Sequence, residues 1–398
     1  MDRGFSTPQT EIDQRIRQLQ HQLLQAGLDG ALILQNTDLF YFSGTIQQSH
    51  LYIPAQGQAL LMVRKNLQRA RSESPLAAII PLTSPNQLMD LIRENGLTVP
   101  VKMGMELDVV PTNTYFSYRK RFPAVKIRDI SMPIRTIRSI KSDYELSLIR
   151  QAAARSDQVA EMVPGLLRAG MTEIELAGLV EAQARRLGHQ GIVRMRLWGA
   201  EMFYGHLMAG AAAAVPSYLA SPTGGAAVNA AVAQGPSFRV IRRNEPVLLD
   251  YVFAWQGYLS DHTRIFVVGR PPQALVDAHQ HMLDLQEAIK IMATPGSIAG
   301  DLYAAAVKMA DQKGMGNHFM GVGPDRIRFI GHGIGLELDE FPFLAAGQTT
   351  ELKAGMVIAL EPKLIFPGKG VVGIENTHVV TRQGLEQLTH AEETIISA

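Results

Sequence analysis

The chain of 398 residues contains no cysteine. Disulfides, iron–sulfur clusters and thiolate zinc sites are therefore excluded, and the composition suits a reducing compartment. The formal net charge is only +1, and no long basic run offers a footprint for nucleic acid. Apolar runs stay short of the roughly 18 residues that a membrane span needs, and Met1–Pro8 lacks the apolar core of a signal peptide. We therefore expect a cytoplasmic protein that binds neither nucleic acid nor membrane.

The composition is that of a globular protein, with 46% hydrophobic and 19% charged residues. A chain of this length exceeds one ordinary core and predicts two domains. Predicted strands and helices alternate through residues 1–133, which favours a small α/β domain. Residues 134–398 begin with two helices, each opened by a capping box, Ser142–Glu145 and Thr172–Glu175. Strands and further helices follow, so we predict an α+β fold with helices covering a curved antiparallel sheet.

The stretch from Val247 to Phe266 is predicted to form a hairpin that turns at Gln256-Gly257. With that turn, Val252 faces Asp261, and Asp250 lies on the same face as Asp261 within the diagonal spacing of neighbouring strands. Two carboxylates this close repel each other unless a counter-charge is present. A divalent metal ion is one candidate. The alternative is that both aspartates are solvated or paired with arginines, namely Arg264 and Arg242 or Arg243.

Three further residues strengthen the case for metal. His332 lies in a glycine-rich segment, Glu361 follows the apolar run Met356–Leu360, and Glu375 lies in a second apolar run. With Asp250 and Asp261 they provide four carboxylates and one imidazole, and four negative charges balance two divalent ions. Such oxygen-rich donors favour Mn²⁺, with Co²⁺, Fe²⁺ or Zn²⁺ as alternatives. The sequence therefore predicts a dinuclear site of the kind that activates a bridging hydroxide.

The order and setting of these five residues resemble those of the pita-bread metallopeptidases, the family of methionine aminopeptidase, aminopeptidase P, prolidase and creatinase. The resemblance covers nearly the whole chain. It implies a creatinase/prolidase-like N-terminal domain (1–133), a pita-bread catalytic domain (134–398), a homodimer, and a role for Glu361 as proton shuttle. The motifs that carry it are Gly257-Tyr-Leu-Ser-Asp-His-Thr-Arg-Ile-Phe266, Gly331-His-Gly-Ile-Gly-Leu-Glu337 and Gly355-Met-Val-Ile-Ala-Leu-Glu-Pro362.

Several positions depart from the family pattern. Ser217 stands where the peptidases have a histidine before the first metal aspartate, and Asp339 replaces a second histidine. Gly373 replaces a frequent arginine, and the usual Glu-Pro-Gly reads Glu-Pro-Lys363. Loss of a donor that stabilises an oxyanion costs about 10²–10³ in rate. His206 is a candidate replacement imidazole, with a loop histidine as the alternative, and Lys363 either contacts a substrate carboxylate or is an ordinary lysine at a strand end.

The leading prediction is a metal-dependent hydrolase that cleaves a peptide bond next to proline, like Xaa-Pro dipeptidases and aminopeptidases. Its substrates would be small peptides or other small molecules. One alternative keeps the metals and acts as a C–N hydrolase or lyase on a small metabolite. Another is a non-catalytic pita-bread binding protein. The site residues that we predict are Asp250, Asp261, His332, Glu361 and Glu375 as metal ligands, and Glu361, His206 and Ser217 as catalytic residues.

Overall fold

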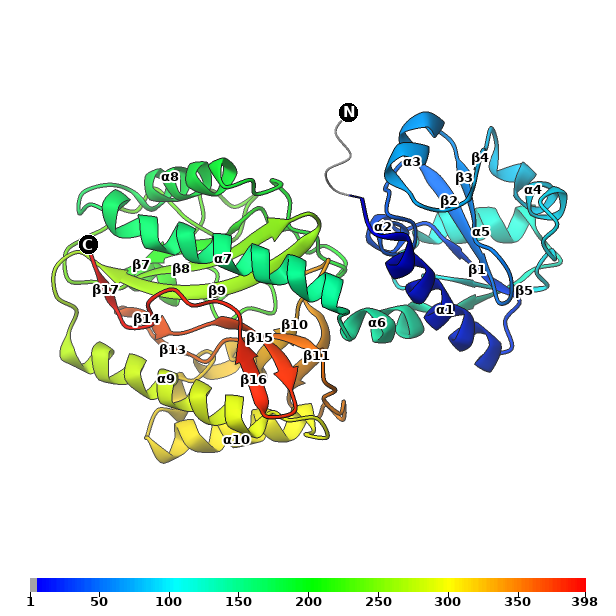
Figure 1. Ribbon diagram of the computed structural model, residues 1–398. Helices are drawn as coiled ribbons and strands as arrows, with labels where there is room; N and C mark the ends of the chain where they lie inside the picture. The colour runs from blue at the N-terminus through cyan, green and yellow to red at the C-terminus, as the bar shows by residue number, and fades with distance from the viewer. Residues whose placement is uncertain (1–5) are drawn as a thin grey trace. The chain divides into compact units, whose positions relative to one another are not determined.

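The computed structural model describes residues 6–398, which divide into two compact units with the boundary between Arg138 and Ser139 (Figure 1). The sequence suggests a linker around Ser131–Arg135, and this segment instead begins helix α6 (Ser131–Ser139). Both units combine helices and sheets, as predicted. The α+β fold class of the larger unit is confirmed.

The first unit is built on a six-stranded mixed sheet with the order β4-β3-β2-β1-β5-β6. Its strands are short, and apolar side chains such as Leu32, Leu60 and Met103 are fully buried in the core of this unit. The strands are β1 (Gly30–Ile33), β2 (Ser49–Pro54), β3 (Leu60–Val63), β4 (Ala78–Pro81), β5 (Lys102–Met105) and β6 (Lys126–Asp129). The helices are α1 (Gln9–Gln25), α2 (Asn36–Ser43), α3 (Leu67–Glu73), α4 (Leu88–Glu94) and α5 (Thr112–Arg121).

Two pairs of helices lie on opposite sides of the second unit (Figure 1). Helices α7 (Asp143–Leu166) and α8 (Glu173–Arg186) begin with the predicted capping boxes, in which Ser142 and Thr172 each bond the backbone of the glutamate three residues on. Helices α9 (Gln273–Met292) and α10 (Ala299–Gln312) form the second pair. Each pair therefore covers its own part of the β-structure.

The strands of the second unit form three sheets. Helices α7 and α8 pack on the sheet β17-β9-β8-β7, and α9 and α10 pack against strands of the other two sheets. The first of these sheets contains β7 (Gly205–Ala209), β8 (Val247–Trp255), β9 (Tyr258–Val267) and β17 (Ile396–Ser397). The second contains β10 (Phe329–Gly333), β11 (Glu340–Ala345), β12 (Val357–Leu360), β15 (Asn376–Thr381) and β16 (Gly384–Gln387), and the third pairs β13 (Lys363–Phe366) with β14 (Gly370–Gly373).

The β8–β9 hairpin has the predicted register, with Trp255 opposite Tyr258 and Val252 opposite Asp261. Gln256 and Gly257 both have positive φ, at 50° and 91°, as a tight two-residue turn requires. Side chains alternate along a strand. Leu249, Tyr251 and Phe253 pack in the core that α7 and α8 cover, so Asp250 points to the opposite face of the sheet.

Candidate metal centre

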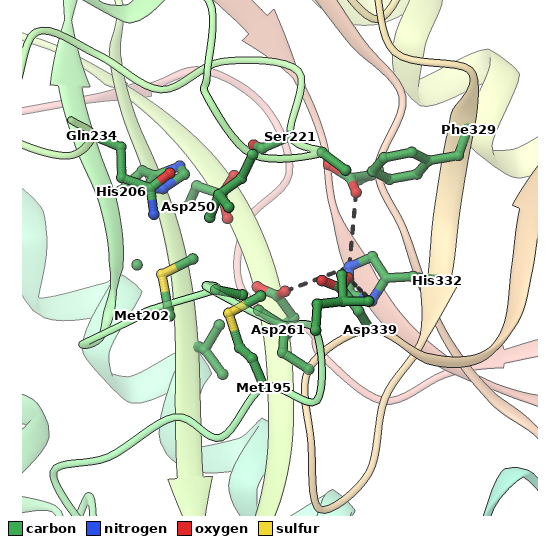
Figure 2. A pocket seen from close by; sticks show the side chains of 18 of the residues that line it. Met195, Met202, His206, Ser221, Gln234, Asp250, Asp261, Phe329, His332 and Asp339 are labelled. Atoms are coloured by element: carbon green, nitrogen blue, oxygen red, sulfur yellow. Dashed lines mark ion pairs between the residues drawn. The ribbon is translucent and has the colours of Figure 1, made fainter. Parts of the chain in front are cut away.

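All five predicted ligands line one cavity of about 230 Å³ in the second unit (Figure 2). Asp250 and Asp261 come from β8 and β9, and His332 comes from β10. Glu361 and Glu375 lie where the chain passes between sheets, from β12 to β13 and from β14 to β15. Residues that are 125 positions apart in sequence, Asp250 and Glu375, thus meet at one point.

The Nε2 atom of His332 faces three carboxylates at nearly equal distances. It lies 3.8 Å from Asp261 Oδ2, 3.7 Å from Glu361 Oε1 and 3.8 Å from Glu375 Oε1. These distances exceed a hydrogen bond. Donor atoms that each bind one ion at about 2.0–2.2 Å are roughly 3–4 Å apart, so the spacing leaves an ion-sized space beside Nε2. The ligand atoms of His332, Asp261 and Glu375 also lie within 4.8 Å of one another.

The backbone around His332 fixes the direction of the ring. Nδ1 lies 3.2 Å from the carbonyl oxygen of Gly333, an interaction that leaves Nε2 as the nitrogen available to a metal ion. A Cβ atom on Gly331 would lie 2.5 Å from the oxygen of Ala359, and one on Gly333 would lie 2.2 Å from the oxygen of Phe341. The glycines are therefore needed for the close packing of β10 against its two neighbouring strands.

Hydrogen bonds attach the aspartate hairpin to the segment that carries Glu375. The hydroxyl of Thr263 donates to Glu375 Oε2 at 2.8 Å, and the side chain of Thr377 bonds both backbone groups of Asp261. The buried guanidinium of Arg264 donates to the carbonyl oxygen of Glu375 and to the side chain of Asn376. Arg264 therefore positions the backbone, and the alternative in which it neutralises Asp250 and Asp261 is wrong.

Lys363 is a central residue of the site whose position the sequence did not predict. Its side chain is fully buried, and Nζ lies 3.0 Å from Asp250 Oδ2, 2.7 Å from Glu361 Oε2 and 2.8 Å from Glu375 Oε2. Both sequence-based interpretations, a contact to a substrate carboxylate and an ordinary lysine at a strand end, are therefore wrong. Two features of the sequence could have indicated this position. Lys363 stands where the family has a glycine, and the predicted site contains four carboxylates but only one imidazole.

Burial and crowding shift the proton affinities of these groups. Burial and the neighbouring carboxylates of Glu375 and Asp250 raise the pKa of Asp261 well above its usual range. Burial raises the pKa of Glu361 to about 7, although Lys363 opposes this shift. Burial acts to lower the pKa of Lys363, but the attraction of the three carboxylates outweighs it and raises this pKa. The three carboxylates thus favour the charged form of the lysine.

The other candidate residues differ in position. His206 is buried on β7 opposite Asp250, lines the cavity, and has no hydrogen-bond partner for Nε2 (Figure 2). Asp339 also lines the cavity, with Oδ1 3.5 Å from His332 Nδ1. Ser217 is absent from the lining, and its hydroxyl accepts a hydrogen bond from the backbone of Leu219. The geometry thus supports His206 and gives no support to Ser217 as a catalytic residue.

Apolar side chains form much of the cavity wall above the acidic floor. Met195 and Met202 belong to a segment without helix or strand that follows α8, and Phe329 comes from β10 (Figure 2). The Pro/Gly-rich segment 219–238, which resembles an insertion beside the site, contributes Leu219, Ala220, Ser221 and Gln234.

Comparisons with known proteins agree with this geometry. The profile of metallopeptidase family M24 matches residues 147–382, and that of the creatinase/prolidase N-terminal domain matches residues 15–140. The chain belongs to metallopeptidase family M24. An Xaa-Pro dipeptidase of Pyrococcus furiosus is 27% identical over 97% of this chain and 100% of the relative.

Solved structures of dipeptidases show the same fold over nearly the whole chain. An Xaa-Pro dipeptidase from Bacillus anthracis matches with a TM-score of 0.83 and 24% identity, covering 97% of this chain and 100% of the other. A dipeptidase from Pyrococcus horikoshii matches with a TM-score of 0.77 and 26% identity, covering 96% and 100%. The pita-bread fold with a creatinase-type N-terminal domain is thereby confirmed. Within residues 6–398, no helix combines the length and hydropathy needed to span a bilayer.

Proposed function

We propose that this M24 protein is a metal-dependent peptidase that hydrolyses the peptide bond next to proline in short peptides. The observation that carries the proposal is the cluster of His332, Asp261 and Glu375, whose ligand atoms lie within 4.8 Å of one another inside the cavity, with Glu361 Oε1 3.7 Å from His332 Nε2. Relatives that are named Xaa-Pro dipeptidases, aligned from end to end, support the choice of substrate.

The donors suit a divalent ion that prefers oxygen ligands and accepts one imidazole. Mn²⁺ fits best, and Co²⁺, Fe²⁺ and Zn²⁺ are alternatives. A bound ion of this kind acts as a Lewis acid and makes water a stronger nucleophile at neutral pH. The sequence predicts two such ions, and the position of Asp250 beside the other ligands is the basis for the second.

The remaining chemistry falls to groups of the protein. Glu361 would accept a proton from the attacking water and pass it to the leaving nitrogen, a role that requires a carboxylate whose basicity is raised toward neutrality. His206 would donate a hydrogen bond from Nε2 to the oxygen of the scissile carbonyl. The apolar wall around Met195, Met202 and Phe329 would contact the substrate and exclude bulk water.

A cytoplasmic homodimer is part of the proposal. Neither nucleic acid nor membrane is expected to take part in the reaction. These points rest on the composition and on the family resemblance.

A panel of Xaa-Pro dipeptides and tripeptides tests the function directly. The protein is reconstituted with Mn²⁺, and release of the amino-terminal residue is followed with Glu361→Gln as the control. We expect turnover by the wild type and at least a 10³-fold loss in the variant. Small amides and betaine-like compounds belong in the same panel. Turnover of those compounds with no cleavage of any peptide would refute the proposed function and favour a metabolite hydrolase.

A further inference from the structure

Two glutamates of the site each place one carboxylate oxygen near His332 and the other near Lys363. Glu361 turns Oε1 toward His332 Nε2 at 3.7 Å and Oε2 toward Lys363 Nζ at 2.7 Å. Glu375 does the same, with Oε1 3.8 Å from Nε2 and Oε2 2.8 Å from Nζ. Shared carboxylates of this kind are how two neighbouring cations are held together. Here a lysine ammonium already occupies one of the two positions.

We propose that Lys363 is the second cation of the centre, so that the protein binds one divalent ion where the sequence predicts two. The ion would be held by Asp261, His332, Glu361 and Glu375, and Asp250 would bind the ammonium. This inference rests on the proposed function only in requiring that the four donors bind metal.

The charges in the site allow this arrangement. Four carboxylates carry a charge of −4, and one divalent ion with one ammonium supplies +3. Two divalent ions would supply +4, but a second ion would need the oxygen atoms that now accept hydrogen bonds from Nζ. It would also have to displace a fully buried lysine, and a buried charge left without partners is strongly destabilising.

The backbone of Lys363 is held in place on both sides. Its carbonyl oxygen accepts a hydrogen bond from the amide of Met320 at 3.0 Å, and the residue pairs with Gly373 across the β13–β14 ladder. A Cβ atom on Gly373 would lie 2.6 Å from Lys363 Cα and 3.0 Å from its Cγ. The glycine therefore leaves the space that the lysine stem needs. The two departures from the family pattern, at positions 363 and 373, belong to one structural change.

The ammonium differs from a metal ion in what it can do. It balances charge and orients Asp250, Glu361 and Glu375 through its three N–H donors, but it has no vacant site to accept an oxygen atom. Polarisation of a substrate oxygen would therefore depend on the single ion and on hydrogen-bond donors such as His206.

Counting metal ions tests the inference without an activity assay. The wild type is loaded with excess Mn²⁺, desalted, and examined by elemental analysis and electron paramagnetic resonance. We expect one Mn²⁺ per chain and the six-line spectrum of an isolated ion. Lys363→Gly, which restores the family residue, is expected to bind two ions whose spins couple through the shared carboxylates. Lys369→Gly removes an exposed lysine from the same hairpin and should leave the count at one.

Each result has a defined meaning. Two ions per wild-type chain would overturn the inference, and so would a folded Lys363→Gly variant that still binds one. No bound ion at all would overturn the proposed metal centre itself. If Lys363→Gly does not fold, a crystal structure of the Mn²⁺-loaded wild type decides. We expect one anomalous peak beside His332 Nε2, and a second peak among Asp250, Glu361 and Glu375 would refute the inference.

Discussion

Lys363 and Gly373 are partners across the β13–β14 ladder, and the missing side chain of the glycine makes room for the buried lysine. Any side chain at position 373 would meet the oxygen of Pro362 at 2.4 Å as well as the lysine itself. The φ of Gly373 is +151°, which L-residues rarely adopt. A substitution at position 373 is therefore expected to affect both the stability of the hairpin and the position of the Lys363 ammonium.

Gly373→Ala should destabilise the second unit more than an alanine elsewhere in the same hairpin. Gly368→Ala is the matched control, because Gly368 has a φ of +75° and no atom within 4 Å of its Cβ position. The control should lose about 1–2 kcal/mol for the left-handed φ alone, and Gly373→Ala a further ~1–3 kcal/mol for overpacking. Thermal unfolding measures both, and equal losses would show that the contact at Gly373 relaxes freely.

His206→Gln should reduce the rate of hydrolysis without removing metal. His206 lines the cavity with an unpartnered Nε2 but does not belong to the four donors around the ion-sized space. If it stabilises the developing oxyanion, kcat should fall about 10²–10³-fold, with little change in KM or metal content. His281→Gln on α9 replaces a histidine outside the cavity lining and serves as the control. A loss of less than threefold at position 206 would exclude the catalytic role.

The sequence was most informative where local patterns are strong. Capping boxes located α7 and α8, and alternation with a tight turn gave the register of β8 and β9, which alone brings Asp250 and Asp261 together. The order of the motifs that resemble the family then indicated His332, Glu361 and Glu375 as the other predicted ligands. These inferences depend on short sequence distances or on whole motifs.

The parts that were missed depend on contacts between distant segments. Whether Lys363 points to solvent or into the site is set by where β13 leaves the sheet of β12 and by the shape of Gly373 ten residues later. Arg264 follows the predicted ligand Asp261 by three residues, yet it points away from that carboxylate and donates to the carbonyl oxygen of Glu375. Strand propensity does not predict where the chain passes from one sheet to another.

The charge of the cavity predicts a preference for substrates without a nearby free carboxylate. Among the residues that line it in the described part of the chain, the titratable groups include carboxylates and imidazoles but no lysine or arginine. The ammonium of Lys363 is already bound to three carboxylates. A free amino terminus is therefore attracted to the carboxylates, whereas the carboxylate of an Xaa-Pro dipeptide has no cationic side chain as a partner in the lining and would depend on the proposed metal ion alone.

Xaa-Pro amides and Xaa-Pro-Xaa tripeptides should accordingly be cleaved with a higher kcat/KM than Xaa-Pro dipeptides. A difference of about tenfold corresponds to about 1.4 kcal/mol, which lies between the roughly 1 kcal/mol in bulk water and the roughly 4 kcal/mol near a protein surface of one charge contact at about 4 Å. Steady-state kinetics on matched peptides that share the first two residues measure it. Faster cleavage of the free dipeptide would show that a cation outside the described lining binds the carboxylate.

His50 should make the first unit less stable in mild acid. Burial, aided by Arg64, lowers its pKa to about 4 from an ordinary 6.5, and its ring bonds the hydroxyl of Tyr118. The unfolded chain therefore binds a proton below pH 6.5 that the folded unit binds only near pH 4. The stabilising contribution is complete above pH 6.5 and is lost as the pH falls toward 4. Its size is at most about 3.5 kcal/mol, because the pKa falls from 6.5 to about 4 and one pKa unit is worth about 1.4 kcal/mol.

His50→Gln keeps a polar partner for Tyr118 and removes the titration. Hydrogen exchange of the core amides in β1 to β3, corrected for its intrinsic pH dependence, reads the opening of the first unit directly. We expect the wild type to lose protection between pH 6.5 and 4.5, and the variant to lose less of it. His21→Gln changes an exposed histidine on α1 and should behave like the wild type.

Buried His189 and His378, whose burial lowers their pKa values to about 4 and about 3, contribute with the same sign in the second unit. The difference between wild type and variant within the first unit therefore isolates His50, and identical pH profiles would show that its ring is already protonated or hydrated in the folded state.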